Sequence, residues 1–93
     1  MLEREIEQAL VKAVKHRGGM CPKFVSPGLD GVPDRIVLLP GSKMAFVETK
    51  APGKTPRPLQ LHRHAQLRKL GFTVYVVDSK EQIERILDEI QAA

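Results

Sequence analysis

The sequence predicts one small α/β domain, in which helices flank a small mixed sheet in the order α-β-β-β-α-β-α. Three patterns predict this fold class. Apolar residues recur at helical spacing near both ends, two apolar runs surround a Pro-Gly turn, and a helical crossover then leads to one more strand. A hairpin followed by such a crossover requires a mixed sheet with helices on its faces. With 93 residues, the whole chain (1–93) is expected to form one domain.

The first helix is expected from Leu2 to Arg17, because two glycines follow and end it. Its apolar face consists of Leu2, Ile6, Ala9, Leu10 and Ala13. The segment from Pro22 to Pro27 then predicts a short strand with Lys23 and Ser26 on its exposed side. A flexible loop, 28–31, leads from this strand to the hairpin.

The hairpin is expected between Asp34 and Lys50. Its apolar runs, 36–39 and 44–47, are separated by Pro40-Gly41-Ser42-Lys43, which is a turn signal. A turn centred on Gly41 pairs Leu39 with Lys43, and the same count pairs Asp34 with Glu48. Residues paired in this way point to the same face of the sheet, with Cβ atoms roughly 4.5–5.5 Å apart.

The remaining elements follow a proline-rich loop at 51–58. A second helix is expected from Arg57 to Leu70, ending at Gly71, and a strand buried on both faces from Phe72 to Val77. Ser79 and Gln82 then form a capping box for a last helix. Its apolar residues recur at helical spacing: Ile83, Ile86, Leu87 and Ile90.

Composition indicates a soluble globular protein, with 28% charged and 42% hydrophobic residues. No apolar run approaches the roughly 20 residues that span a bilayer, and the acidic N-terminus does not resemble a signal peptide. The single Cys21 excludes an internal disulfide and a zinc site built on cysteines. These features predict a cytoplasmic protein without a membrane partner.

Charge is unevenly distributed around the net value of +4. No acidic residue occurs from Gln8 to Leu29 or from Thr49 to Val77, whereas lysines and arginines recur in both stretches. A basic field around a small acidic cluster suits a metal-using enzyme that acts on a polyanion. An ordinary solubilising surface would show the same charges.

The acidic cluster is the candidate site. Asp34 and Glu48, directly opposed, would repel each other unless a divalent cation such as Mg²⁺ or Mn²⁺ lay between them. Lys50 shares their face and could polarise a water or stabilise charge on a phosphoryl oxygen. A surface hairpin with a simple Glu–Lys pair is the alternative. On the first helix Glu3 borders the apolar face and could point to the site, whereas Glu5 and Glu7 are assigned to the helix dipole.

These residues carry a resemblance to a known family. Glu3-x-x-Ile6, Gly31-Val32-Pro33-Asp34, Glu48-Thr49-Lys50 and Gln60 resemble the VRR-NUC family, the virus-type replication–repair nucleases of the PD-(D/E)xK superfamily. The resemblance extends from the first helix through the strand that ends at Val77. It implies a restriction-endonuclease-like fold, and free-standing members of this size look like phage or bacterial proteins that act as dimers on branched DNA.

By this resemblance each motif residue has an expected role. Asp34 and Glu48 would bind the metal together with the backbone carbonyl of Thr49. Lys50 would help to activate the attacking water, and Gln60 would position water or phosphate. Glu3 would complete the metal shell or orient its water, although the sequence leaves the choice between Glu3 and Glu7 open.

The sequence therefore predicts a Mg²⁺- or Mn²⁺-dependent DNA endonuclease, homodimeric and selective for branched DNA such as four-way (Holliday) junctions, with a role in DNA repair. A catalytically silent nucleic-acid-binding module with the same fold is the alternative, and a protein–protein adaptor is disfavoured by the basic stretches. Phosphates are expected to contact Lys23, Ser26, Arg35, Lys54, Arg57 and Arg63. The three histidines, His16, His62 and His64, are interpreted as surface residues.

Overall fold

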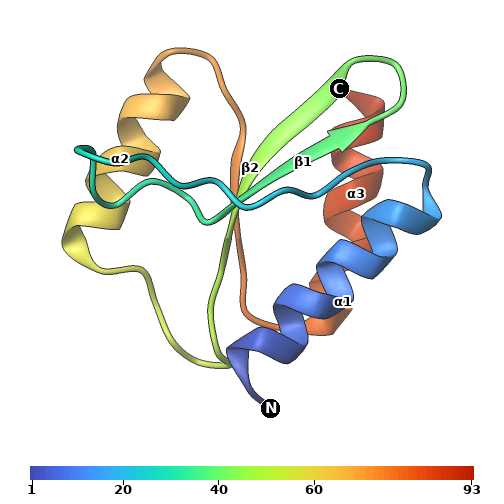
Figure 1. Cartoon of the computed structure of the whole chain (residues 1–93), viewed down its shortest axis with the longest axis horizontal. Helices are drawn as coiled ribbons and strands as arrows, with labels where there is room; N and C mark the ends of the chain where they lie inside the picture. The colour runs from blue at the N-terminus through green and yellow to red at the C-terminus, as the bar shows by residue number, and fades with distance from the viewer.

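The computed structural model describes all 93 residues, in three α-helices, three strands and one short 3₁₀ turn (Figure 1). In chain order these elements are α1 (Glu3–His16), β1 (Arg35–Leu39), β2 (Lys43–Thr49), α2 (Pro58–Lys69), β3 (Val74–Val77), the 3₁₀ turn η1 (Lys80–Gln82) and α3 (Ile83–Ala92). The observed order, α-β-β-α-β-α, confirms the predicted fold class with one strand fewer. None of the helices combines the length and apolarity that crossing a bilayer requires.

The sheet is mixed, with β2 at its centre. β1 runs antiparallel to β2, and β3 runs parallel to β2 after the crossover through α2. The hairpin has the register predicted from the turn residues. Leu39 lies opposite Lys43, and the pairing continues without a bulge to Arg35 opposite Val47.

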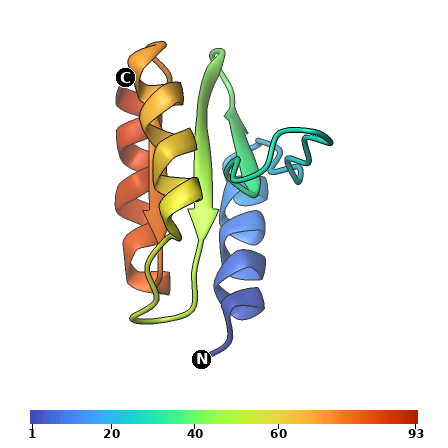
Figure 2. The ribbon, with the colours of Figure 1, turned by 90° about the vertical axis from the view of Figure 1, so that its left-hand side faces the viewer.

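The two faces of the sheet are covered differently (Figure 1). α1 and α3 lie together on one face, where Val37, Ala45 and Val47 join their apolar residues in the main hydrophobic core. Figure 2 looks onto α2, which lies on the opposite face. Because side chains alternate along a strand, Phe46 and Glu48 point to the α2 face.

The α2 layer is unusually polar. The buried residues of α2 are Gln60 and His64, and none of its apolar side chains is buried. The apolar packing on this face comes instead from three aromatic rings, with Phe46 lying 5.6 Å from Phe24 and 5.8 Å from Phe72 between ring centroids. Buried polar side chains of a helix need polar partners on the sheet beneath, and Glu48 is the partner of Gln60 and His64.

The predicted strand from Pro22 to Pro27 was wrong, because the segment forms only isolated bridges at Met20–Leu38 and Lys23–Arg35. It does lie along the outer edge of β1. Met20 and Leu38 exchange two backbone hydrogen bonds of 2.9 Å, and Ile36 N donates to Pro22 O at 3.0 Å. Pro22 has no N–H to return, so the ladder is interrupted at its centre.

Candidate active site

The site lies where β1 begins and β2 ends. Asp34 immediately precedes β1, and Glu48 and Thr49 are the last two residues of β2, with Lys50 directly after them. The observed register, with Arg35 opposite Val47, continues by one step to Asp34 opposite Glu48. The hairpin therefore brings the predicted acidic pair to one end of the sheet, beneath the N-terminal half of α2.

Asp34 is held in place by Thr49. The Asp34 carboxylate accepts a hydrogen bond of 3.0 Å from the Thr49 backbone N and one of 2.5 Å from the Thr49 hydroxyl. Burial raises the pKa of Asp34, whereas these two bonds lower it and the charge of Glu7 raises it. The carboxylate is thus fixed at the strand end by the residue that follows Glu48.

Pro33, the residue before Asp34, bears on the Thr49 backbone. Continued by two steps beyond Arg35, the register places Pro33 opposite Thr49, and the Thr49 N–H points toward the β1 side. The N–H and C=O of one strand residue point to the same side. Pro33 has no N–H to donate to the Thr49 carbonyl. Independently of this, the Thr49 N–H donates to the Asp34 carboxylate and not to a backbone oxygen. One proline therefore leaves a backbone oxygen next to the acidic pair.

Gly31 lets the preceding loop approach α2. Its φ is +86°, and a Cβ placed there would lie 2.9 Å from both the side chain and the backbone oxygen of Leu59. A second contact between this loop and α2 is the hydrogen bond of 2.7 Å from Arg63 Nε to the Asp30 carbonyl. The loop that precedes Asp34 is therefore held against α2, the helix that covers Glu48.

Glu48 is buried, with 4% of its surface exposed, yet it lies among polar groups. Gln60 Nε2 donates to its Oε2 at 3.2 Å, Lys50 Nζ lies 4.0 Å from the same oxygen, and His64 Nε2 lies 3.4 Å from Oε1. Burial and then the charge of Asp34 raise the pKa of Glu48 to about 7, although Lys50 lowers it. The charge of Asp34 thus acts on Glu48.

Gln60 is oriented by the start of α2. Its side-chain oxygen accepts a hydrogen bond of 2.8 Å from the backbone N of Arg57, the residue that caps the helix. That bond uses the amide oxygen and turns the amide NH₂ toward Glu48. The proline-rich loop before α2 therefore determines which group Gln60 presents to the site.

The acidic residues of α1 also reach this region. Glu7 forms an ion pair of 2.9 Å with Arg35, which donates further to the Cys21 carbonyl at 2.8 Å. Glu3 is exposed at the start of α1, and its charge contributes to the raised pKa of Glu48. Assigning Glu7 to the helix dipole alone was wrong, because its carboxylate pairs with Arg35 at the start of β1.

His64 was also misassigned from the sequence. It is fully buried against Glu48 and not on the surface, whereas His16 and His62 are exposed as expected. The sequence signal for His64 was its spacing from Gln60. Residues four apart share a face of a helix, so a helix that turns Gln60 inward also turns His64 inward.

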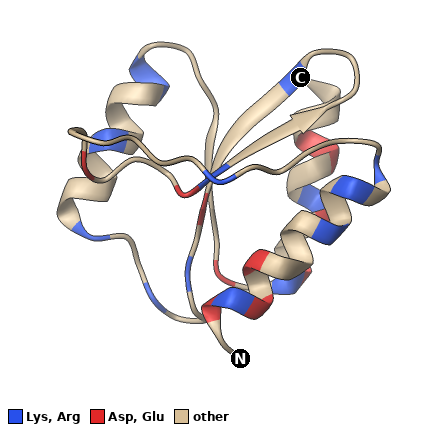
Figure 3. Ribbon diagram, in the orientation of Figure 1, with Lys and Arg blue, Asp and Glu red and all other residues tan.

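The predicted DNA-contacting residues differ in their exposure. Lys23, Lys54 and Arg57 are exposed, and Figure 3 shows basic residues both on the loop before α2 and along that helix. Ser26 is partly buried in the turn before Leu29. Arg35 is engaged by Glu7 and the Cys21 carbonyl, with 14% of its side chain exposed. Its guanidinium therefore supports the strand end next to Asp34.

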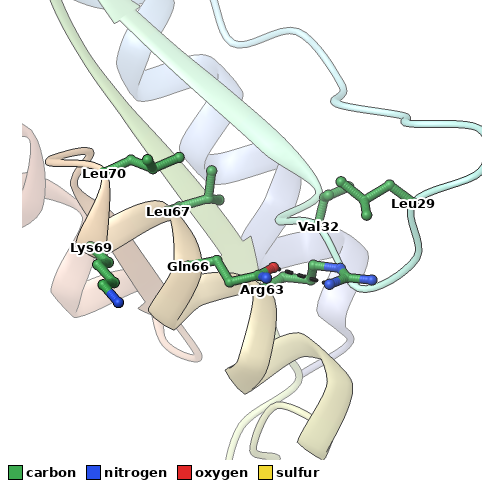
Figure 4. Close-up of a pocket in the computed structure, with 7 residues that line it drawn as sticks. All are labelled: Leu29, Val32, Arg63, Gln66, Leu67, Lys69 and Leu70. Carbon is green, nitrogen blue, oxygen red and sulfur yellow. Dashed lines mark hydrogen bonds between the residues drawn. The ribbon is translucent and has the colours of Figure 1, made fainter.

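Arg63 borders a pocket beside the site, with a volume of about 720 Å³ (Figure 4). The apolar wall of this pocket is formed by Leu29, Val32, Leu67 and Leu70, and Gln66 and Lys69 complete its lining. Arg63 donates to Gln66 Oε1 at 3.0 Å, as the dashed line in Figure 4 marks. Val32, which lines the pocket, lies two residues before Asp34 in the chain.

The oxygen atoms at the site are of the kind that hard divalent cations prefer. No group of three or more His, Cys, Asp and Glu side chains is arranged to hold a metal ion. The candidate ligands are instead the Asp34 and Glu48 carboxylates and the Thr49 carbonyl that Pro33 leaves without a ladder donor. Two carboxylates, a carbonyl and water fit Mg²⁺, which keeps several waters and binds one or two carboxylates beside a phosphate.

A mixed sheet flanked by helices, with an Asp and a Glu-x-Lys at one end of its hairpin, is the restriction-endonuclease-like nuclease fold. Comparison with solved structures supports this class. A structure described as a VRR_NUC domain superposes with a TM-score of 0.86 at 30% identity, covering 95% of this chain and 97% of that one.

A named relative agrees with the structural match. The protein named "Putative nuclease p44" of Acyrthosiphon pisum secondary endosymbiont phage 1 is 54% identical over 79 residues, which is 85% of each chain. No family model matches the sequence. The chain belongs to the VRR-NUC family of nucleases, and the resemblance found in its motifs is confirmed.

Proposed function

We propose that this protein is a Mg²⁺- or Mn²⁺-dependent DNA endonuclease that cuts branched DNA such as four-way junctions. The observation that supports it most strongly is the meeting of Asp34, Glu48 and Lys50 at one strand end. Glu48 is buried beside a second carboxylate, and its pKa is raised to about 7. Lys50 lowers the pKa of Glu48 but does not offset the effects of burial and of Asp34. A divalent cation would relieve the repulsion between the two carboxylates.

The chemistry follows from the positions of the side chains. Phosphodiester hydrolysis needs a water in line with the leaving oxygen and positive charge for the extra negative charge of the transition state. Asp34, Glu48 and the Thr49 carbonyl would hold the ion, which when bound lowers the pKa of water and neutralises phosphoryl charge. Lys50, 4.0 Å from Glu48, would orient the attacking water or stabilise the phosphoryl oxygen.

The surroundings suit a DNA substrate. The exposed Lys54 and Arg57 precede α2, and Arg63 lies one turn after Gln60 on the same helix. These cations would contact phosphates on either side of the cut and fix the register of the DNA without reading its sequence. A protein acting on intracellular DNA in this way would work in the cytoplasm of a bacterial host.

Selectivity for branched DNA is proposed together with a homodimer. A C2 dimer presents two sites related by symmetry, which suits paired cuts in a symmetric junction. The chain exposes large apolar side chains that a second subunit could cover: Met20 is 66%, Val25 75% and Leu70 74% exposed. Light scattering tests this point, and a monomer at the working concentration would reject paired cleavage.

The decisive experiment is a cleavage assay on labelled four-way junction, flap and linear duplex DNA, in Mg²⁺, Mn²⁺ or EDTA. We expect metal-dependent products that Asp34→Asn and Lys50→Ala reduce on the order of 100-fold or more, with DNA binding retained. Lys15→Ala, an exposed lysine on α1, is the matched control. Tight binding without cutting in any metal would identify a silent binding module. Equal cutting of duplex and junction would reject structure selectivity alone.

A further inference from the structure

His64 is the buried polar residue of the site that the proposed chemistry does not use. It lies on the inner side of α2 with 0% of its surface exposed, and its Nε2 is 3.4 Å from Glu48 Oε1. One turn earlier, Gln60 donates to the other carboxylate oxygen, Oε2, at 3.2 Å. Two residues four positions apart on one helix thus approach the two oxygens of Glu48 separately.

The ring of His64 can hydrogen-bond to Glu48 only through Nε2. Its Nδ1 is buried and has no hydrogen-bond partner, so Nε2 is the ring nitrogen with an acceptor in reach. A proton on Nε2 gives Glu48 a hydrogen-bond donor.

We propose that His64 is a positioning residue for Glu48, which with Gln60 fixes the plane of the carboxylate so that it can bind a divalent cation. Each carboxylate oxygen has two acceptor sites. One bond from α2 to each oxygen leaves the remaining acceptor sites available to a metal ion. Groups that orient a metal ligand in this way typically change metal affinity or activity by about 10- to 100-fold when removed.

This inference rests on the proposed metal-dependent function, but its test does not depend on cleavage. Mn²⁺ binding to the protein without DNA is measured by calorimetry for the wild type, His64→Leu and His64→Gln. His64→Leu should weaken Mn²⁺ binding about 10- to 100-fold. His64→Gln, whose amide can donate near the position of Nε2, should recover most of the loss. His62→Leu, an exposed residue on the same helix, should bind as the wild type does.

The outcomes separate the two proposals. A wild type that binds no Mn²⁺ would refute the proposed function, whereas wild-type affinity in a folded His64→Leu would refute only the role of His64. Equal loss in His64→Leu and His64→Gln would also overturn it, because that result indicates packing alone. Should His64→Leu not fold, the ¹⁵N resonances of His64 in the wild type decide. A proton on Nε2 and a shift of that resonance on adding Mg²⁺ are expected, and a proton on Nδ1 would overturn the inference.

Discussion

Replacing Glu48 by Gln should stabilise the metal-free protein at alkaline pH, although Glu48 is a central residue of the site. The pKa of Glu48 rises from its usual 4.5 to about 7 in the folded chain. At about 1.36 kcal/mol for each pKa unit, this difference amounts to about 3 kcal/mol. Glu48 is only 4% exposed, so solvent screens little of this cost. The folded state thus resists ionisation of a carboxylate that the unfolded chain ionises freely.

The sign follows from the two pKa values. Because the folded state binds the Glu48 proton more tightly, its contribution to stability is complete below about pH 4.5 and is lost as the pH rises to about 7. Between pH 5 and pH 8 the wild type should lose between about 2 and 3 kcal/mol that Glu48→Gln keeps. Glu48→Gln should nevertheless be inactive, since an amide is a poor ligand for Mg²⁺.

The assay is urea unfolding in EDTA at several pH values between 5 and 8. Glu5→Gln, an exposed residue of α1, is the matched control and should follow the wild-type curve. The pH dependence of other groups cancels when each variant is compared with the wild type at the same pH. Parallel curves for the wild type and Glu48→Gln would refute the argument that burial and the charge of Asp34 make ionisation costly.

Three further predictions concern residues around the site. Gly31→Ala should cost about 1–2 kcal/mol more in urea unfolding than Gly28→Ala, which has a similar positive φ but open space around it; equal costs would exclude the clash with α2. Burial raises the pKa of Cys21 to about 11, so at pH 8 its thiol should react with Ellman's reagent roughly 100-fold more slowly in the native protein than in urea. Thr49→Val should lose about 1–2 kcal/mol in thermal unfolding because Asp34 Oδ2 loses its donor, and Thr49→Ser should not.

The hairpin could be predicted from the sequence because its information is local. The turn residues determine the register, and the two-residue period of a strand then determines which side chains share a face. Counting from Gly41 was enough to pair Leu39 with Lys43 and to bring Asp34 beside Glu48. Lys50 followed by the same alternation, and it lies 4.0 Å from Glu48.

The groups that surround Glu48 and Asp34 could not be predicted equally well, because they come from other elements. The rotation of α2 over the sheet determines that His64 meets Glu48, and the packing of α1 determines that Glu7 meets Arg35. Neither contact follows from spacing within one element. Comparing His64 with Gln60, and not with His62, would have identified the inward face of α2.

The missing N–H of proline matters in two places. It made the predicted strand at Pro22 wrong, and it affects the backbone next to Asp34. Pro22 removes a donor from the segment beside β1, so an expected strand becomes a series of isolated bridges. Pro33 removes a donor at the other edge of the same strand, opposite Thr49. There Pro33 has no N–H to offer the Thr49 carbonyl, while the N–H and hydroxyl of Thr49 donate to the Asp34 carboxylate. An alanine in place of Pro33 would offer that carbonyl an N–H and close the ladder over it. The proline of the Gly-x-Pro-Asp motif therefore withholds a donor from the Thr49 carbonyl, and the aspartate beside it accepts the Thr49 N–H.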